Sequence, residues 1–258
     1  MIYEKLEQYR KRTAGFMRES LPCSGVFETN QNLRLKVNEE GKFLPFSGDT
    51  VFFDLNDDIK QYVGQIQTIL YQNCRDMLAT PIRQSSFHVT LHDLSSGTLE
   101  SGLKNQMEKN RKAAEQILQN RERKKTSPLR VRTVSVFNMV NTSVVLGLEP
   151  EDEESCGRLM ELYECFQKIV LLNYPLTLHI TLGYYRPGKY PESHIKNLGG
   201  IFNDLNQKIR SGFCLNEEKL VYARFTDMNH YFCSAEEKSY GCVNKNIWKP
   251  QCDEEERQ

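Results

Sequence analysis

Two short phrases with the same pattern of residue types could do chemistry together. They are His88-Val89-Thr90-Leu91 and His179-Ile180-Thr181-Leu182, and each reads histidine, apolar residue, threonine, apolar residue. The chain has only five histidines, so this coincidence is improbable at background composition. Side chains two residues apart on a β-strand point to the same face. Each phrase therefore predicts a strand with a histidine and a threonine on one face and an apolar opposite face.

Two imidazoles on opposite walls of one small site suit in-line displacement at phosphorus. A neutral imidazole takes a proton from the attacking oxygen, while an imidazolium gives one to the leaving oxygen. Both forms coexist near neutral pH because the unperturbed pKa of histidine is about 6.5. The threonine hydroxyls would donate hydrogen bonds to phosphate oxygens in the transition state. The sequence thus predicts His88, Thr90, His179 and Thr181 as catalytic residues of a site that needs no metal.

Two residues continue the alternation beyond the phrases. Tyr185 is predicted on the face of His179 and Thr181, where it would bind substrate by stacking on a base or donating to phosphate, or lie at the rim of the site. His92 is predicted on the face of His88, either as a third proton carrier or as an exposed residue at the strand end.

Cationic residues near the motif strands offer further substrate contacts. Arg83 and Arg186 flank the two strands and could bind a second phosphate or the anionic product, or could simply be surface arginines. A basic run between 121 and 132 either guides RNA toward the site or complements a helix C-terminus. An acidic run at 149–154 suits the start of the next helix and gives no hint of a metal site.

A repeated succession of elements must position the two phrases. Hydrophobic periodicity predicts an N-terminal helix at 3–18 and then strand, helix, strand, helix, strand, twice over. The predicted ranges are 50–55, 59–77, 85–91, 99–124 and 129–137, followed by 142–148, 159–170, 176–184, 195–209 and 220–225, with a last strand at 230–233. The turn-rich segment 23–48 is expected to include a short strand at 33–37.

The repeat predicts a duplicated, bilobal α+β fold. Two pseudo-symmetric lobes of antiparallel sheet, each backed by helices, would enclose an active-site cleft between them. We expect a lead-in segment at 1–48, a bilobal domain at 49–235 with lobes near 49–140 and 141–235, and a C-terminal tail at 236–258. The duplication leaves open whether strands exchange between the lobes.

Composition narrows the class of protein. The chain has 258 residues, 39% of them hydrophobic, and 34 basic residues balance 34 acidic ones, so electrostatics alone would not hold duplex nucleic acid or a membrane. The first residues lack the order of a signal peptide, and no window reaches the roughly 18 apolar residues of a membrane span, so we expect a cytoplasmic protein. The eight cysteines include no Cys-x-x-Cys pair, and no nucleotide-binding glycine motif or serine-hydrolase elbow is present.

The paired phrases at 88–91 and 179–182 resemble the signature of the two-histidine (2H) phosphoesterase superfamily. That group includes 2′-5′ RNA-ligase-like proteins and cyclic nucleotide phosphodiesterases. The layout is similar over roughly 49–235, and the lead-in at 41–50 is similar to an uncharacterised branch. The resemblance implies a bilobal fold, metal-free chemistry on cyclic phosphates or 2′-5′ phosphodiesters, and catalytic roles for the histidines and threonines of both phrases.

The function predicted from these features is a metal-independent phosphodiesterase without a cofactor. It would act as a monomer on a cyclic phosphate or 2′-5′ phosphodiester of a nucleotide, an RNA end or another small molecule. One histidine would be the base and the other the acid, and the pseudo-symmetry leaves open which is which. The alternatives are a non-catalytic module that binds a nucleotide or RNA end, and a scaffold in which neither histidine affects a ligand.

Overall fold

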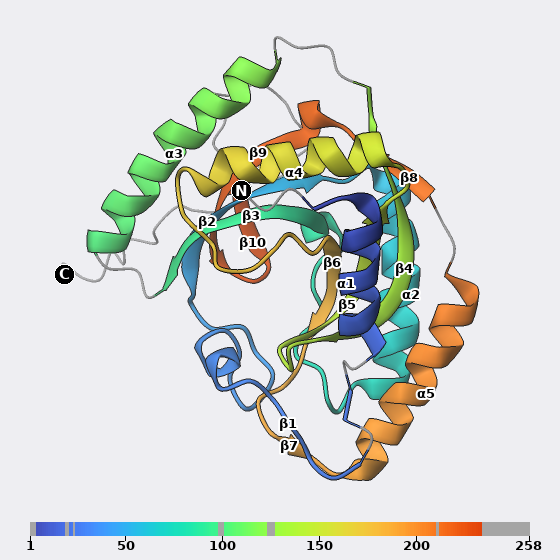
Figure 1. Ribbon diagram of the computed structural model, residues 1–258. Helices are drawn as coiled ribbons and strands as arrows, with labels where there is room; N and C mark the ends of the chain where they lie inside the picture. The colour runs from blue at the N-terminus through green and yellow to red at the C-terminus, as the bar shows by residue number, and fades with distance from the viewer. Residues whose placement is uncertain are drawn as a thin grey trace, which may run out of the picture.

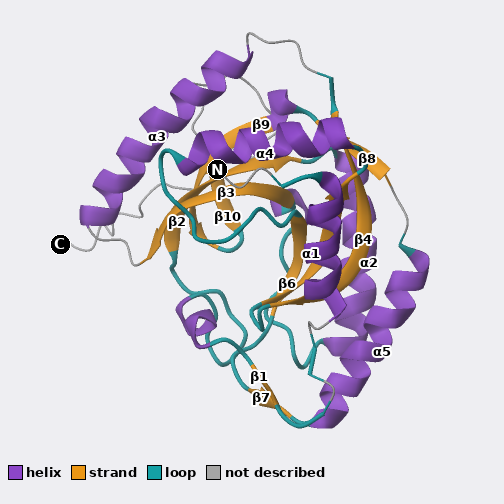
Figure 2. Ribbon diagram, in the orientation of Figure 1, coloured by secondary structure: helices purple, strands orange, loops and turns teal. Residues whose placement is uncertain are grey.

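Two four-stranded antiparallel sheets lie at the centre of the fold (Figures 1 and 2). This computed structural model describes residues 4–18, 21–22, 24–97, 101–122, 127–209 and 212–233, so the predicted tail at 236–258 lies outside the described residues. In the first sheet the strand order is β10 (His230–Cys233), β9 (Leu220–Asp227), β2 (Ser47–Asp54), β3 (His88–Gly97). In the second it is β6 (His179–Tyr184), β5 (Ser143–Pro150), β4 (Leu129–Met139), β8 (Gly212–Leu215).

The two sheets exchange strands between the halves of the sequence. β4 comes before residue 140 but pairs with β5 in the second sheet, while β9 and β10 come from the end of the described chain and complete the first sheet. The mixture of helices with curled antiparallel sheets makes this an α+β bilobal fold, as the repeated pattern predicted.

The α-helices of the described chain occupy the positions that periodicity predicts, to within a few residues. They are α1 (Leu6–Arg18), α2 (Asp57–Cys74), α3 (Ser101–Glu122), α4 (Glu153–Gln167) and α5 (Glu192–Lys208). None of them is both long enough and apolar enough to cross a membrane. α2 packs against β6 and α4 packs against β3, so a helix from each half of the chain covers the motif strand of the other half.

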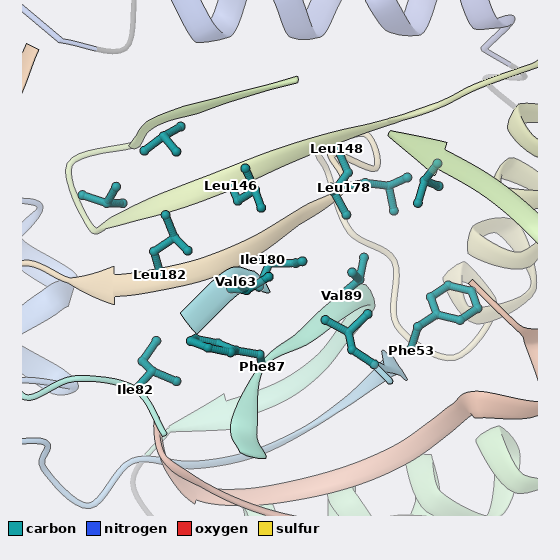
Figure 3. Close-up of a cluster of buried hydrophobic side chains, with 14 of the residues drawn as sticks. Phe53, Val63, Ile82, Phe87, Val89, Leu146, Leu148, Leu178, Ile180 and Leu182 are labelled. Carbon is teal, nitrogen blue, oxygen red and sulfur yellow. The ribbon is translucent and has the colours of Figure 1, made fainter. Parts of the chain in front are cut away.

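The motif strands β3 and β6 lie beside each other as the inner edges of the two sheets. The phrase residues that alternate with the histidines and threonines belong to one continuous core, which Figure 3 shows in part. Val89 and Ile180 are 0% exposed, and Leu91 and Leu182 are buried beside them. Because side chains alternate along a strand, this burial turns the histidine and threonine faces away from the core.

The lead-in segment departs from the prediction. The expected strand at 33–37 is wrong, because Gln31–Leu35 forms a 3₁₀ helix, η1. The side chain of Asn30 caps this helix by accepting a hydrogen bond from the backbone N–H of Asn32 at 2.9 Å. Leu33 is then buried in the core without strand pairing.

Several short elements have too few residues to show a period. They are the two-stranded sheet of β1 (Phe27–Glu28) and β7 (Lys189–Tyr190), strand β8, and the 3₁₀ helices η2 (Gln84–Ser86) and η3 (Glu217–Lys219). The sequence pattern did not predict them.

The fold predicts a large stability cost for Ile180→Ala. The side chain is fully buried in the core that both motif strands share, so truncation should lower the free energy of unfolding by about 2–5 kcal/mol. Urea unfolding followed by circular dichroism measures this. Leu171→Ala is the matched control, because Leu171 is 84% exposed and should change stability by no more than about 0.5 kcal/mol. Equal effects of the two variants would contradict the packing described.

Candidate active site

The two motif histidines occupy equivalent places, because each is the first residue of its strand. His88 and Thr90 are partly buried, and so are His179 and Thr181, while the residue between each pair is fully buried. The predicted alternation is therefore present in both strands. Because β3 and β6 are neighbours, the structure brings the four side chains to adjacent strands of one site.

Each imidazole is held in one tautomer by the backbone. Nδ1 of His88 lies 2.8 Å from the carbonyl oxygen of Ser86, and Nδ1 of His179 lies 2.7 Å from that of Thr177. A carbonyl oxygen only accepts hydrogen bonds, so Nδ1 is the nitrogen that carries the hydrogen in each neutral ring. Nε2 then has a free lone pair in both rings and can accept a proton from a substrate.

Burial keeps His88 neutral. Its ring stacks on Phe52 with centroids 4.3 Å apart and meets the edge of Tyr231 at 4.8 Å. The pKa of His88 is lowered to about 4, chiefly by desolvation and in part by the nearby His179, against the opposing effects of the Ser86 carbonyl and Asp93. At neutral pH His88 is therefore a proton acceptor.

His179 is also shifted toward the neutral form. Burial lowers its pKa, while the hydrogen bond to the Thr177 carbonyl and the charge of Asp93 raise it. Among the described residues no aromatic ring is stacked on His179 as Phe52 is on His88. The two imidazoles thus have the same tautomer but different surroundings.

A β-bulge at the last residue of the first phrase changes which residues face the site. In the pairing of β2 with β3, Phe52 is opposite Thr90 but Val51 is opposite His92, so Leu91 is an extra residue in β3. An extra residue shifts the alternation by one position. The next residue on the face of Thr90 is therefore Asp93, which is exposed, and not His92.

The second phrase ends in the same irregularity. In the pairing of β5 with β6, Val145 is opposite Thr181 but Val144 is opposite Gly183, which leaves Leu182 as the extra residue. Tyr184 is consequently the next residue on the face of His179 and Thr181. Asp93 and Tyr184 are thus equivalent positions in the two halves.

The bulges overturn two predicted placements. Tyr185 is not on the face of the site: it is 0% exposed, and its ring meets Phe27 edge-on at 5.0 Å in the core. His92 is neither on that face nor exposed at a strand end, since it is 1% exposed and packs against Tyr163 at 5.0 Å. In both cases the prediction assumed strict alternation along the strand. The strand contains an extra residue without a partner in the neighbouring strand, and this residue reverses the faces beyond it.

The site includes residues that sequence reasoning missed. Asp93 lies close enough to both histidines to raise their pKa values, and Tyr174 donates its hydroxyl to Oδ2 of Asp93 at 3.0 Å. Phe52 and Tyr231 enclose His88 as described above. The sequence does contain a signal for Phe52, which is a large ring on a strand predicted beside the motif strand. The position of Asp93 depends on the bulge, and that of Tyr174 depends on the path of a loop, so neither could be predicted from the sequence pattern.

In the described part of the chain, no contact joins either of the predicted arginines to a histidine or threonine of the two phrases. Arg186 donates from Nη2 to the carbonyl oxygen of Glu39 at 3.3 Å, and its stem lies against Gly41. Arg83 is exposed, and its backbone N–H donates to the side chain of Asn229 at 2.8 Å. Arg186 therefore holds the lead-in segment, while the guanidinium of Arg83 faces solvent.

The basic and acidic runs largely neutralise each other. Arg130 pairs with Asp152 at 2.5 Å and Arg132 with Glu149 at 2.5 Å, the latter across β4 and β5, where the two residues are register partners. Arg121 pairs with Glu217 at 3.4 Å. These three arginines of the basic run therefore have carboxylate partners within the chain. Residues 123–126 of the run are not among those that the structure describes.

Within the described ranges, no group of three or more histidine, cysteine, aspartate and glutamate side chains is arranged to hold a metal ion.

The fold and the site define a bilobal α+β protein with a His-x-Thr phrase on each of two neighbouring strands. Comparison of the sequence with protein-family models and with curated proteins found no match. Among solved structures, the chain has the fold of ATU0111, a conserved protein of unknown function from Agrobacterium tumefaciens str. C58. The TM-score is 0.61 at 15% identity, over 79% of this chain and 91% of that chain.

Two further structures align with lower scores. TT0787 of Thermus thermophilus has a TM-score of 0.43 at 13% identity, over 72% of this chain and 94% of that chain. Escherichia coli LigT complexed with 3′-AMP has a TM-score of 0.42 at 11% identity, over 74% and 96%. At these scores the two likenesses add nothing to the argument for fold or function.

The packing around His88 predicts how its pKa responds to mutation. Phe52→Ala exposes the imidazole to water and so should raise its pKa toward about 6.5, the unperturbed value. Titration of the histidine ring resonances by NMR measures this. Phe232→Ala is the control, because Phe232 is 55% exposed on β10 beside Tyr231. A wild-type His88 that titrates at or above 6.5 would contradict the desolvation described.

Proposed function

We propose that the chain is a metal-independent phosphodiesterase of the two-histidine (2H) phosphoesterase type. It opens a cyclic phosphate or cleaves a 2′-5′ phosphodiester of a nucleotide or an RNA end. The observation that carries the proposal is the matched pair of imidazoles, whose Nδ1 atoms are bound to the carbonyl oxygens of Ser86 and Thr177. Both Nε2 atoms remain available for proton transfer.

We base the assignment of the two roles on the different surroundings of the histidines. His88 is enclosed by Phe52 and Tyr231, and burial lowers its pKa to about 4, so we assign it as the base. His179, on which no described ring is stacked and whose pKa Asp93 raises against burial, is assigned as the acid that carries the proton. Neutral His88 accepts a proton from water as the oxygen–phosphorus bond forms. His179 donates its proton to the leaving oxygen as the old phosphorus–oxygen bond breaks. Exchange with solvent then restores both protonation states.

Nearby polar groups support this reaction. The hydroxyls of Thr90 and Thr181, one beside each histidine, donate hydrogen bonds to the non-bridging phosphate oxygens as charge develops. The carboxylate of Asp93 raises the pKa of His179 and so favours the imidazolium that the acid role requires. The exposed Arg83 is proposed to contact the substrate as well, and its guanidinium would suit an anionic group.

A non-catalytic module that binds a nucleotide or RNA end is the alternative function. Binding alone does not require two rings with the same tautomer, because any hydrogen-bond donor can hold phosphate. Turnover of a 2′,3′-cyclic nucleotide by the purified chain separates the two functions. The cytoplasmic location and the monomeric state are part of the same proposal.

Removal of either motif histidine should abolish most of the activity. His88→Ala and His179→Ala should each lower kcat on a 2′,3′-cyclic nucleotide by about a hundredfold or more, because a positioned acid or base contributes on the order of 10²–10⁴. Activity and circular dichroism should be measured on the same samples. His194→Ala is the control, since His194 lies on α5, away from the phrases, and pairs with Asp76. Near wild-type activity in either motif variant would exclude the two-histidine mechanism.

The dependence of kcat/KM on pH should be bell-shaped with an acidic optimum. The rate falls below the pKa of His88, about 4, as the base becomes protonated. It falls again as pH rises through the pKa of His179, which burial lowers, because the acid loses its proton. We expect the maximum below about 6.5. Assays from about pH 3 to 9, with and without excess EDTA, should give the same profile. An EDTA-dependent loss that Mg²⁺ or Mn²⁺ restores would show that the reaction needs a metal.

A further inference from the structure

A lysine from the lead-in segment lies among aromatic rings next to the site. Nζ of Lys36 is 5.1 Å from the ring centroid of Phe46 and 6.0 Å from that of Tyr184. Among the described residues, no carboxylate forms an ion pair with Lys36 and no side chain or carbonyl accepts a hydrogen bond from its ammonium group. Lys36 is partly buried, so among the described residues this positive charge has two aromatic rings but neither full hydration nor a hydrogen-bond acceptor.

The backbone fixes the position of Lys36. Its N–H donates to the carbonyl oxygen of Leu33 at 2.9 Å, and its carbonyl oxygen accepts from the N–H of Leu44 at 2.9 Å. The same segment is tied to β9, because the N–H of Phe46 donates to the carbonyl oxygen of Thr226 at 2.9 Å. The ammonium group is therefore carried by an ordered loop that is joined to the first sheet.

A row of aromatic rings connects Lys36 with His88. Tyr231 lies 4.8 Å from His88, Phe225 lies 5.5 Å from Tyr231, and Phe46 lies 6.2 Å from Phe225, all between ring centroids. Lys36 lies over the last of these rings. The lysine is thus on the same side of the fold as the motif histidine but is offset from it along the aromatic row.

The electrostatics favour an anionic ligand at Lys36. Burial lowers the pKa of Lys36, and the carboxylate of Asp93 raises it. Asp93 also raises the pKa values of both histidines, and it accepts a hydrogen bond from the hydroxyl of Tyr174. In the described part of the chain it forms no ion pair with Lys36, so it does not neutralise Lys36 by direct contact. A partly buried ammonium without an acceptor is costly, and an anionic group that accepts hydrogen bonds from it removes that cost.

We propose that Lys36, with Phe46 and Tyr184, forms a subsite for a second phosphate group of the substrate, separate from the phosphodiester that is cleaved. The inference rests on the proposed function, since it names the class of substrate for the same site. The histidines and threonines of the two phrases bind the reacting phosphate, and Lys36 binds a phosphate farther along the molecule. The preferred substrates are then cyclic phosphodiesters of nucleotides that carry an additional phosphate.

The experiment compares two substrates that differ by one phosphate. They are adenosine 2′,3′-cyclic phosphate and the same nucleotide with a 5′-phosphate, and the readout is the ratio of their kcat/KM values. Wild type should prefer the phosphorylated substrate by about tenfold or more, the order expected of one charge-assisted contact. Lys36→Met should abolish the preference, and Lys36→Arg should retain it. Lys42→Met is the matched control, because Lys42 is exposed in the same segment and pairs with Glu40.

The outcomes separate this inference from the proposed function. Turnover of both substrates with the same ratio in wild type and Lys36→Met would overturn the subsite and leave the phosphodiesterase intact. Turnover of neither substrate, together with no cleavage of a 2′-5′-linked dinucleotide, would overturn the proposed function. In that case calorimetry with adenosine 2′-monophosphate and adenosine 2′,5′-bisphosphate decides the inference. Tighter binding of the bisphosphate that is lost in Lys36→Met supports the subsite, and equal binding of the two ligands overturns it.

Discussion

The burial of the apolar residues in the two motif strands is the constraint on which the site depends. Val89 and Leu91 in β3, and Ile180 and Leu182 in β6, are all buried in one core. With a period of two along a strand, a slip by one residue would bury the polar set and expose the apolar set. Packing of these four side chains therefore fixes the register, and the register directs the histidines and threonines away from the core.

The same packing accounts for the electrostatics of the site. A histidine placed at the start of a strand, beside the core, loses much of its hydration, and its charged form is disfavoured. The carbonyl oxygens of Ser86 and Thr177 partly offset this by accepting the Nδ1 hydrogen, which leaves the lone pair of each neutral ring on Nε2. Asp93 is the carboxylate that acts on both rings. Ring orientation and protonation state are thus consequences of the fold.

The two halves of the site are similar in backbone and different in side chains. Both motif strands have the same bulge at the last residue of the phrase, and both histidines have the same hydrogen bond. The register partner of Thr90 is Phe52, whereas that of Thr181 is Val145. At the next position on the face, the first half has Asp93 and the second has Tyr184. The duplicated backbone therefore provides two imidazoles, and their neighbours differ, since Phe52 and Tyr231 pack against His88 alone.

The sequence alone determined the features that depend on local periodicity. The phrases, their strands and the helices between them follow from residue types at spacings of two and about 3.6. The duplicated order of elements likewise predicted an α+β fold with two similar sheets. These predictions succeed because burial on one face of an element leaves a repeating pattern in the chain.

The tertiary structure decided what depends on strand pairing and on distant segments. The bulges at Leu91 and Leu182 arise from pairing with β2 and β5, so no pattern within the phrases could show that Tyr185 and His92 would turn into the core. Lys36 comes from a segment whose sequence predicted a strand, and that segment forms a 3₁₀ helix and a hydrogen bond to β9 that the sequence pattern did not indicate. Alternation is a property of one strand, whereas the position of a bulge and the neighbours of a loop are set by contacts between strands.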